Sequence, residues 1–248
     1  MTGSFTNRAL DGLRMHRALG CIWLSLGSPA LAEIAAEHAP DAIVFDTQHG
    51  LWERAALQAS IGVAAAASTP LVRVAANIGH LIGEALDSGA QGVIVPLVES
   101  AAEAAAAVRS AHYPPHGNRS GGGVRPLANF GAYSAACATQ ILVAVMIETQ
   151  AGFDNTAAIV ATRGVDMVFI GPGDLGLSVG TAALEAAIQS ILAACRAHAM
   201  PCGIFTGSVD DARRRVAQGF AFVVVEDDIR LTRGGIGRSL EAFAQDPA

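Results

Sequence analysis

Eight short apolar runs recur along this chain, and each is separated from the next by a longer segment of helical length. The runs are continuously apolar, which is typical of parallel strands that are covered on both faces. A strand followed by a helix, repeated eight times, predicts an α/β protein with one closed (β/α)₈ barrel (TIM barrel) domain over residues 1–248. The predicted strands are residues 21–26, 42–45, 71–74, 92–98, 141–147, 165–170, 202–205 and 220–225.

The predicted helices fill the intervals between these strands. An open doubly wound sheet is the alternative arrangement of alternating strands and helices. It would normally carry a glycine-rich phosphate-binding sequence after the first strand, and Leu26-Gly27-Ser28-Pro29 is not one. The barrel is therefore favoured. Its predicted helices are residues 29–38, 53–67, 78–88, 101–111, 181–198, 209–218 and 229–243.

Composition excludes several classes of protein. Hydrophobic residues make up 52% of the 248 residues, enough to fill a barrel of about 250 residues. A net charge of −6 gives no electrostatic reason to bind nucleic acid or an anionic membrane. The four cysteines lack the spacing of a disulfide framework or a zinc site, and no stretch approaches the roughly 20 apolar residues of a membrane span. We expect a cytoplasmic protein that binds neither nucleic acid nor membrane.

One connection, residues 112–136, is too long for an ordinary loop between a strand and a helix. It follows the fourth predicted strand and is rich in glycine, proline and aromatic residues. Long loops in compact domains are usually functional. Its triple glycine would suit a phosphate cradle, but no Lys-Ser/Thr pair follows it. The sequence favours a mobile loop or one that contacts another subunit.

Polar residues gather at the carboxyl ends of the predicted strands. In a barrel of this type these ends form the active-site mouth, whereas polar groups at the opposite rim contribute to stability. The prediction therefore places a site at these residues: Ser25, Asp46 to Gly50, Arg73, Glu148 to Gln150, Gly171 to Asp174, and Thr206.

Glu148 and Asp174 end neighbouring strands, so their carboxylates can converge. Two unpaired carboxylates repel each other, which raises the pKa of one of the two carboxyl groups. Oxygen ligands without a nearby Cys or His pattern favour Mg²⁺ or Mn²⁺ and leave about four octahedral positions for waters and substrate. Two alternatives remain: each carboxylate caps the helix that follows it, or the two share a proton as an acid/base pair.

Two cationic or titratable residues lie beside these carboxylates. Arg73 interrupts an apolar strand, where a guanidinium is costly to bury unpaired. It either pairs with a core carboxylate or neutralises a substrate oxyanion. His49 follows Asp46 by three residues, close enough for that carboxylate to orient the imidazole for acid/base catalysis.

Six motifs, in this order and spacing, resemble the class II pyruvate aldolases of the HpcH/HpaI family over about residues 19–243. They are FDTQHG (45–50), LVRVAAN (71–77), LDSGAQGVIVPLV (86–98), YPPHGNR (113–119), MIET (146–149) and FIGPGDL (169–175). The resemblance implies a barrel in which a divalent metal, Mg²⁺ or Mn²⁺ with Co²⁺ as a further candidate, binds pyruvate or hydroxypyruvate and stabilises its enolate. The enolate adds to an aldehyde, and the reverse reaction is retro-aldol cleavage.

The resemblance also implies roles for individual residues. Glu148 and Asp174 would be the metal ligands, and Arg73 would hold the oxygen of the enolate. The backbone amides of Gly173 and Asp174 would bind the substrate carboxylate. His49, with Asp46, would belong to the acid/base apparatus.

Assembly is a further implication. Asp87 matches an aspartate that reaches a neighbouring subunit's site. The resemblance implies a hexamer, a dimer of trimers, in which the last helix, residues 229–243, is exchanged between subunits.

Two departures from the family pattern bear on the substrate. Many relatives have Glu where Gln48 stands, and Gln48, a candidate substrate-binding residue, donates a hydrogen bond but takes up no proton. Some relatives have Gln at the position of Met146, which donates no bond to a substrate carboxylate.

Other functions use similar chemistry. A metal-dependent oxaloacetate-type decarboxylase or a citrate-lyase-β-like lyase would use the same enolate, although a coenzyme A substrate would need a basic groove. A non-catalytic barrel would be expected to have lost Glu148, Asp174 or Arg73. A Schiff-base aldolase needs a lysine, and the chain has none.

Overall fold

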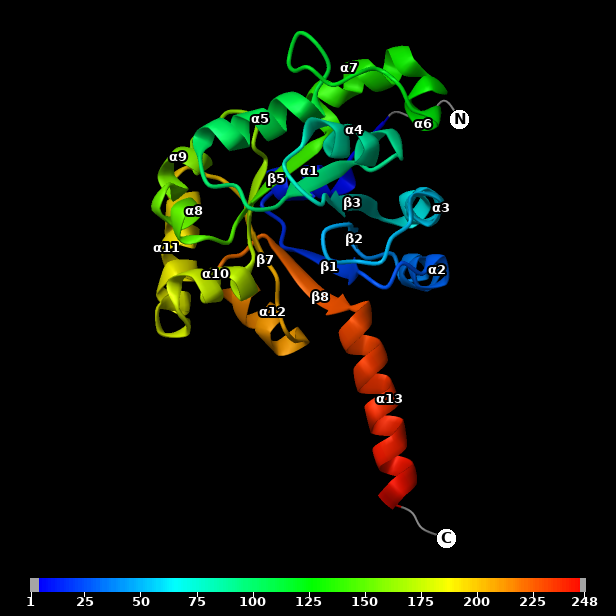
Figure 1. Ribbon diagram of the computed structural model, residues 1–248, viewed down its shortest axis with the longest axis vertical. Coiled ribbons are helices and arrows are strands. Elements are labelled where there is room, and N and C mark those ends of the chain that lie inside the picture. The colour runs from blue at the N-terminus through cyan, green and yellow to red at the C-terminus, as the bar shows by residue number, and fades with distance from the viewer. Residues whose placement is uncertain (1–4, 246–248) are drawn as a thin grey trace.

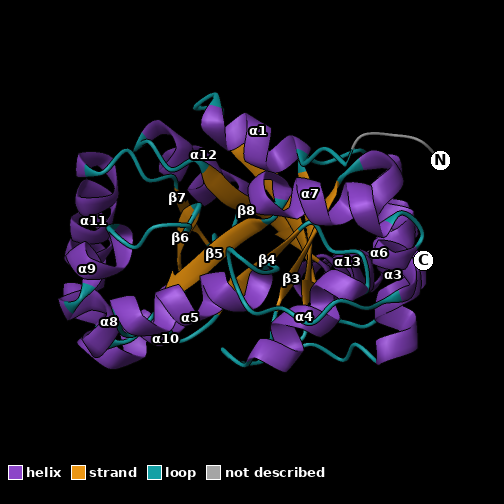
Figure 2. Ribbon diagram, turned by 90° about the horizontal axis from the view of Figure 1, so that it is seen from above, coloured by secondary structure: helices purple, strands orange, loops and turns teal. Residues whose placement is uncertain are grey.

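The computed structural model describes residues 5–245, and in them eight parallel strands close into a barrel whose spatial order is the order of the chain. Helices surround the strands on the outside (Figures 1 and 2). The predicted (β/α)₈ barrel and all eight predicted strands are confirmed. The strands are β1 (Leu19–Leu24), β2 (Ala42–Asp46), β3 (Thr69–Arg73), β4 (Gly92–Val95), β5 (Leu142–Ile147), β6 (Met167–Ile170), β7 (Cys202–Ile204) and β8 (Phe222–Asp227).

The seven predicted helices are present within a residue or two of their expected ends. They are α2 (Pro29–Glu37), α3 (Arg54–Ala67), α4 (Gly79–Asp87), α5 (Ala101–Ala111), α11 (Thr181–Ala197), α12 (Val209–Ala217) and α13 (Asp228–Gln245). Short helices that the sequence pattern did not reveal are α1 (Arg8–Arg14), α8 (Gln150–Asp154), α9 (Thr156–Val160) and α10 (Pro172–Val179).

Alternate residues of each strand serve two separate cores. Side chains that point inward, such as Val44, Leu71 and Phe169, fill the barrel, and three buried residues of α1 pack against them. Side chains that point outward, such as Ile43 and Val72, pack against the surrounding helices. This period of two follows from the pleat of a strand. Because the interior is filled by side chains, a binding site can form only at an end of the barrel.

The connection of residues 112–136 is more regular than the sequence predicted. It contains α6 (Val124–Leu127) and the first part of α7 (Phe130–Gln140). The last residue of its triple glycine, Gly123, has φ +85°, and a Cβ there would lie 2.7 Å from the Cβ of Asp87 on α4. Glycine is therefore required at this position by close packing and by backbone conformation.

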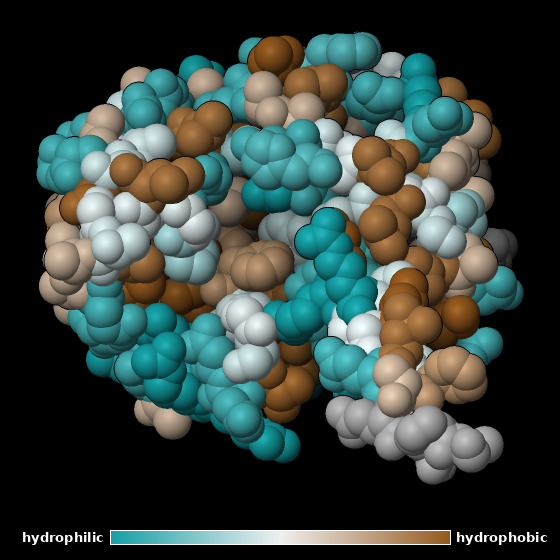
Figure 3. Space-filling model, turned by 60° about the horizontal axis from the view of Figure 1, so that its bottom comes forward, coloured by the Kyte–Doolittle hydropathy of each residue, from teal (hydrophilic) through white to brown (hydrophobic). Residues whose placement is uncertain are grey.

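The last helix, α13, leaves the barrel and projects away from it (Figure 1). Large apolar side chains along it are exposed, from 52% for Leu231 to 84% for Phe243. Brown, hydrophobic side chains gather near α13 beside the grey C-terminal residues in Figure 3. Within the described residues, no helix combines the length and the apolar character that crossing a membrane requires.

Candidate active site

The strand ends that the sequence singled out lie around the mouth of the barrel. Seen with the end that carries α13 turned forward, the surface is hollowed at its centre and bordered by hydrophilic side chains (Figure 3). Asp46 and Arg73 are the last residues of two adjacent strands, β2 and β3, and are partners in the strand register. Glu148 directly follows β5, and Asp174 lies in the first turn of α10, after β6.

Asp46 and Arg73 form a buried, two-pronged ion pair. The Nε of Arg73 donates to Oδ1 of Asp46 at 2.9 Å, and Nη2 donates to Oδ2 at 2.5 Å. The guanidinium also lies over the ring of Trp23, 5.1 Å from its centroid. Burial raises the pKa of Asp46, but the Arg73 charge and two backbone amides outweigh burial and hold the pKa below its ordinary value. Asp46 is therefore an ionised carboxylate that orients Arg73.

The pairing with a core carboxylate, one of the two alternatives predicted for Arg73, is thus present, and it leaves part of the guanidinium available. Arg73 is 9% exposed, and Nη1 has no hydrogen-bond partner among the described residues. Because a guanidinium has five N–H donors, the pair with Asp46 does not exhaust them. The same side chain can therefore be fixed by Asp46 and donate to a ligand.

Glu148 is 1% exposed, and only one of its two carboxylate oxygens has a hydrogen-bond partner in the described residues. Its Oε1 accepts from the backbone N–H of Leu97 at 2.8 Å, whereas Oε2 is buried without a hydrogen-bond partner in the described residues. Burial is the largest cause that raises the pKa of Glu148, and the charge of Asp174 raises it further. An unpaired buried oxygen is costly unless a proton, a metal or a ligand satisfies it.

The start of α10 faces this unpaired oxygen. A Cβ added to Gly171 would collide with Oε2 of Glu148, so the absence of a side chain there allows the helix to begin beside the carboxylate. Gly173 and Asp174 are exposed in the first turn, where backbone N–H groups have no partner within the helix. This helix start is suited to binding an anionic group.

The residues present fit a divalent cation. In the described part of the chain, no group of three or more His, Cys, Asp or Glu side chains gathers as a complete metal cage. A Mg²⁺-type site does not need one, because one or two carboxylates plus waters and substrate complete its octahedron. Glu148, whose Oε2 has no partner in the described residues, and the exposed Asp174 supply two such carboxylates. Both offer only oxygen atoms to a cation.

The contact between Asp46 and His49 differs from the prediction. Oδ1 of Asp46 accepts from the backbone N–H of His49 at 3.2 Å, and not from the imidazole. The ring is exposed and has no partner among the described residues. Gln48 is held in the same way by its backbone N–H, and its buried side-chain Oε1 has no hydrogen-bond partner in the part of the chain that the structure describes. Asp46 therefore shapes the loop that presents both side chains.

Asp87 does not join the site of its own chain. Its Oδ1 accepts from Nη2 of Arg119 at 2.7 Å, and it lines a cavity between α4 and the residues that follow α5, whereas His49 lines a different cavity. Arg119 itself is 5% exposed and lies 4.7 Å from the ring centroid of Tyr113 and 5.4 Å from that of Tyr133.

Sequence reasoning missed the role of Arg119, although the residue is part of the YPPHGNR motif. An arginine among aromatic residues was the available signal. The buried guanidinium fixes the Asp87 carboxylate at the end of α4.

Comparison with known proteins agrees with this geometry. A model of the HpcH/HpaI aldolase/citrate lyase family matches residues 20–233. The chain belongs to the HpcH/HpaI aldolase/citrate lyase family. The predictions of family and of lyase chemistry are thereby confirmed.

Individual proteins resemble the chain over almost its whole length. A 5-keto-4-deoxy-D-glucarate aldolase of Salmonella arizonae is 37% identical over 236 residues, which cover 91% of both chains. The crystal structure of an HpcH/HpaI family protein from Burkholderia cenocepacia J2315 has a TM-score of 0.91 and 32% identity, with 96% of this chain and 100% of that chain covered. The citrate synthase SbnG has a TM-score of 0.84 and 28% identity, with 95% and 97% covered.

Proposed function

We propose that this HpcH/HpaI family member forms and cleaves the C3–C4 bond of 4-hydroxy-2-oxo acids, with pyruvate or hydroxypyruvate as donor and an aldehyde as acceptor. The observation that carries the proposal is the buried, unpaired Oε2 of Glu148 beside Asp174 and the free Nη1 of Arg73. Two carboxylates and one guanidinium suit a 2-oxo acid that develops negative charge as an enolate. The name of the Salmonella arizonae relative supports aldol chemistry.

Each polar group has a task in binding the donor. The free amides of Gly173 and Asp174 at the start of α10 bind the substrate carboxylate. Nη1 of Arg73 donates to the 2-oxo oxygen, and Asp46 keeps the guanidinium in place for that bond. Glu148 and Asp174 would hold a Mg²⁺, Mn²⁺ or Co²⁺ ion, which would supply positive charge to the oxygens of the 2-oxo acid.

The cleavage reaction also needs a base near C4. The exposed imidazole of His49 accepts the proton of the C4 hydroxyl, whose oxygen becomes the carbonyl oxygen of the released aldehyde. The C3–C4 bond breaks, and its electron pair passes to the 2-oxo oxygen as an enolate. A proton returned to C3 then gives pyruvate. Addition of pyruvate to an aldehyde is the reverse sequence.

The activity test is the incubation of pyruvate with a panel of aldehydes, with and without Mg²⁺ or Mn²⁺. We expect a 4-hydroxy-2-oxo acid to form only when the metal is present. Exchange of the pyruvate methyl protons in D₂O, without aldehyde, reports the enolate separately. Absence of both condensation and exchange would contradict the proposal.

A related reaction is the second candidate. The name of the citrate synthase SbnG, 28% identical to this chain, supports a condensation in which a 2-oxo acid is the acceptor. Oxaloacetate added to the same assay distinguishes these reactions. Release of CO₂ without any condensation product would favour an oxaloacetate-type decarboxylase.

We also propose that the chain forms a hexamer in the cytoplasm. The exposed apolar residues of α13 need a partner surface, and an apolar cavity of about 230 Å³ lies at the root of that helix, between α2 and β8. Large exposed apolar patches are typical of association surfaces. The four cysteines are all buried and unpaired, which suits a reducing compartment.

An active site shared between two subunits, with Asp87 from one and His49 from the other, predicts that two inactive variants can complement each other. If Asp87 supports the His49 of a neighbouring subunit, mixed oligomers of His49→Ala and Asp87→Asn contain some interfaces at which both residues are intact. The asparagine keeps an acceptor for Arg119, so the buried guanidinium does not lose its partner. We expect each variant alone to be inactive and the mixture, after subunit exchange, to regain part of the parent activity. Subunit exchange is checked by mass spectrometry. The shared site would be disproved if light scattering showed that the active protein is a monomer. It would also be disproved if the mixture regained no activity after subunit exchange had been demonstrated.

A further inference from the structure

A cavity of about 440 Å³ lies at the end of the barrel opposite to the active-site mouth. Its walls come from the segments that lead into β1, β7 and β8 and from the carboxyl-terminal parts of α11 and α12. This volume is within the range of small-molecule sites, about 300–1,000 Å³. Most of the lining is apolar, with the side chains of Leu13, Leu192, Met200, Val216 and Phe220.

Three helices end at this cavity, and each is followed by a lining residue with positive φ. His16 after α1 has φ +56°, Ala199 after α11 has φ +52°, and Gly219 after α12 has φ +92°. The backbone N–H of each donates to the carbonyl three residues earlier, at 3.0, 3.1 and 2.8 Å. This way of ending a helix satisfies terminal carbonyl oxygens within the turn. The polar character of the cavity therefore comes mainly from side chains.

Arg196 is the cationic side chain in the lining, and most of its donors are free. Its Nη2 donates to the backbone oxygen of Gln218, whereas Nε and Nη1 have no hydrogen-bond partner among the described residues. A Cβ on Gly219 would collide with Nη2, so the glycine leaves room for the guanidinium at the edge of the cavity. Because a guanidinium has five N–H donors, the bond to Gln218 leaves several available for a ligand.

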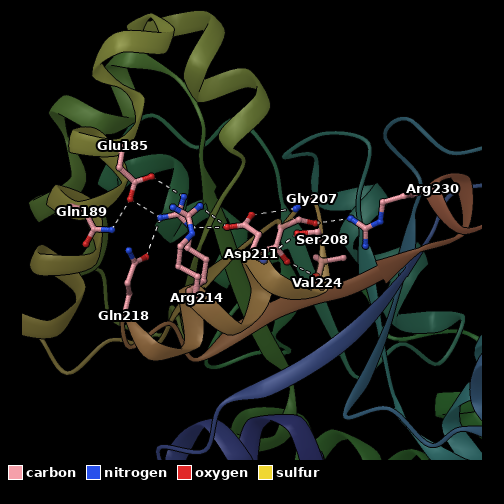
Figure 4. A network of polar contacts seen from close by, with 11 residues as sticks. Glu185, Gln189, Gly207, Ser208, Asp211, Arg214, Gln218, Val224 and Arg230 are labelled. Carbon is pink, nitrogen blue, oxygen red and sulfur yellow. Dashed lines mark hydrogen bonds and ion pairs between the residues drawn. The ribbon is translucent and has the colours of Figure 1, made fainter. Parts of the chain in front are cut away.

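No described carboxylate neutralises Arg196. The acidic side chains on α11 and α12 that form ion pairs do so with the arginines at positions 213–215. In Figure 4, Glu185 and Gln218 belong to one polar network, since both accept from Arg215, at 2.8 and 3.1 Å. None of the described residues that line the cavity is a carboxylate. The network fixes α11 against α12 and leaves the charge of Arg196 uncompensated.

We propose that this cavity binds a monocarboxylate with a hydrocarbon body, with the carboxylate at Arg196 and the hydrocarbon on the apolar walls. The free N–H groups of the guanidinium form charge-assisted hydrogen bonds with a carboxylate, and the imidazole of His16 lies in the same lining. A cationic ligand would be repelled by Arg196, and a neutral hydrocarbon would leave its donors without a partner. The site is independent of the proposed catalytic residues, which lie at the other end of the strands.

Calorimetric titration of the parent protein with octanoate tests the proposal. We expect saturable binding of one octanoate per chain. In the series butanoate, hexanoate and octanoate, the Kd should fall by about fourfold for each added CH₂ group that the cavity buries. Octanol, which has the same chain without the charge, should bind about tenfold more weakly. This is the lower end of the effect of a hydrogen bond to a charged group, because Arg196 is exposed.

Two variants separate the charge from the apolar walls. Arg196→Gln should lower the affinity for octanoate about tenfold and leave that for octanol unchanged, since the amide still offers an N–H to the carbonyl of Gln218. Val216→Trp places a larger side chain on the wall and should abolish binding of both ligands. Arg213→Gln is the matched control, because Arg213 is an exposed arginine on α12 that does not line the cavity. Thermal unfolding shows whether each variant is folded.

The proposal would be overturned if the parent showed no saturable binding of octanoate, or if octanoate and octanol bound equally well. An equal loss of octanoate affinity in Arg196→Gln and Arg213→Gln would overturn the assignment of Arg196. A second copy of the chain is the alternative occupant of the cavity. It would be indicated, against the proposal, if the parent bound no octanoate and Val216→Trp lowered the molar mass in light scattering.

Discussion

Removal of divalent metal with a chelator is expected to abolish turnover and leave the barrel folded. The core of the barrel is built from apolar side chains, whereas the proposed metal contacts only Glu148 and Asp174 at the mouth. Without the cation, the buried Oε2 of Glu148 has no partner and the enolate loses the charge that stabilises it. Addition of Mg²⁺, Mn²⁺ or Co²⁺ should restore the rate. Aldol formation and circular dichroism on the same samples check both parts of the prediction.

Glu148→Gln separates loss of the metal from other effects of the chelator. We expect this variant to show no Mn²⁺ binding in calorimetry and a turnover rate at least about 100-fold below that of the parent. This loss exceeds the 10–100-fold loss of activity that is typical when a residue that only orients a metal ligand is replaced. Glu37→Gln is the control, since Glu37 is an exposed residue at the end of α2, far from the strand ends that form the mouth. Full turnover of a metal-free parent sample would show that the reaction does not depend on a metal.

Arg73→Lys is expected to lower the rate of pyruvate proton exchange about 10²–10³-fold, the usual effect of removing one oxyanion donor. The lysine keeps a positive charge beside Asp46 but has no planar fork, so it cannot hold the carboxylate with two bonds and donate a third to the substrate. Exchange measured by NMR in D₂O, together with thermal unfolding, checks the prediction.

Arg73→Ala should behave differently from Arg73→Lys in stability. It leaves the Asp46 carboxylate buried without its partner, and breaking a buried ion pair in this way typically costs about 3–5 kcal/mol. The sequence left open whether Arg73 pairs with a core carboxylate, and the observed pair is the reason for this expected loss of stability. Proton exchange at the parent rate in Arg73→Lys would show that the role of Arg73 is confined to holding Asp46.

The order of strands and helices was predictable because it depends on local patterns. Continuous apolar runs of strand length, separated by helical segments, leave few arrangements other than a closed parallel barrel. The helices α6 and α7 escaped prediction because glycine, proline and aromatic residues interrupt any periodic apolar pattern in residues 112–136. Contacts with the rest of the fold stabilise these helices, as the packing of Gly123 against Asp87 illustrates.

The residues of the site were predictable as a set, but their partners were not. The sequence placed Asp46, Arg73, Glu148 and Asp174 at the carboxyl ends of strands. The structure has Asp46 and Arg73 at strand ends, Glu148 directly after β5, and Asp174 in the first turn of α10, after β6. It gave Asp46 the imidazole of His49 as a partner, whereas the carboxylate contacts the guanidinium of Arg73 and the backbone of the loop. It also predicted no partner for Asp87 within its own chain, whereas Asp87 pairs with Arg119, 32 residues away.

Hydrophobic periodicity and strand-end position, both properties of short segments, therefore determined the barrel, the location of its mouth and the chemical types of its polar groups. The register of adjacent strands decided which of those groups form pairs, because it aligns Asp46 with Arg73 across β2 and β3. Burial decided which groups stay unpaired: Oε2 of Glu148 and Nη1 of Arg73 have no partner in the described residues. The position of a residue at a strand end does not reveal which of its atoms find a partner. Ion pairing and desolvation act through space between segments distant in the chain, so only the tertiary structure could fix them.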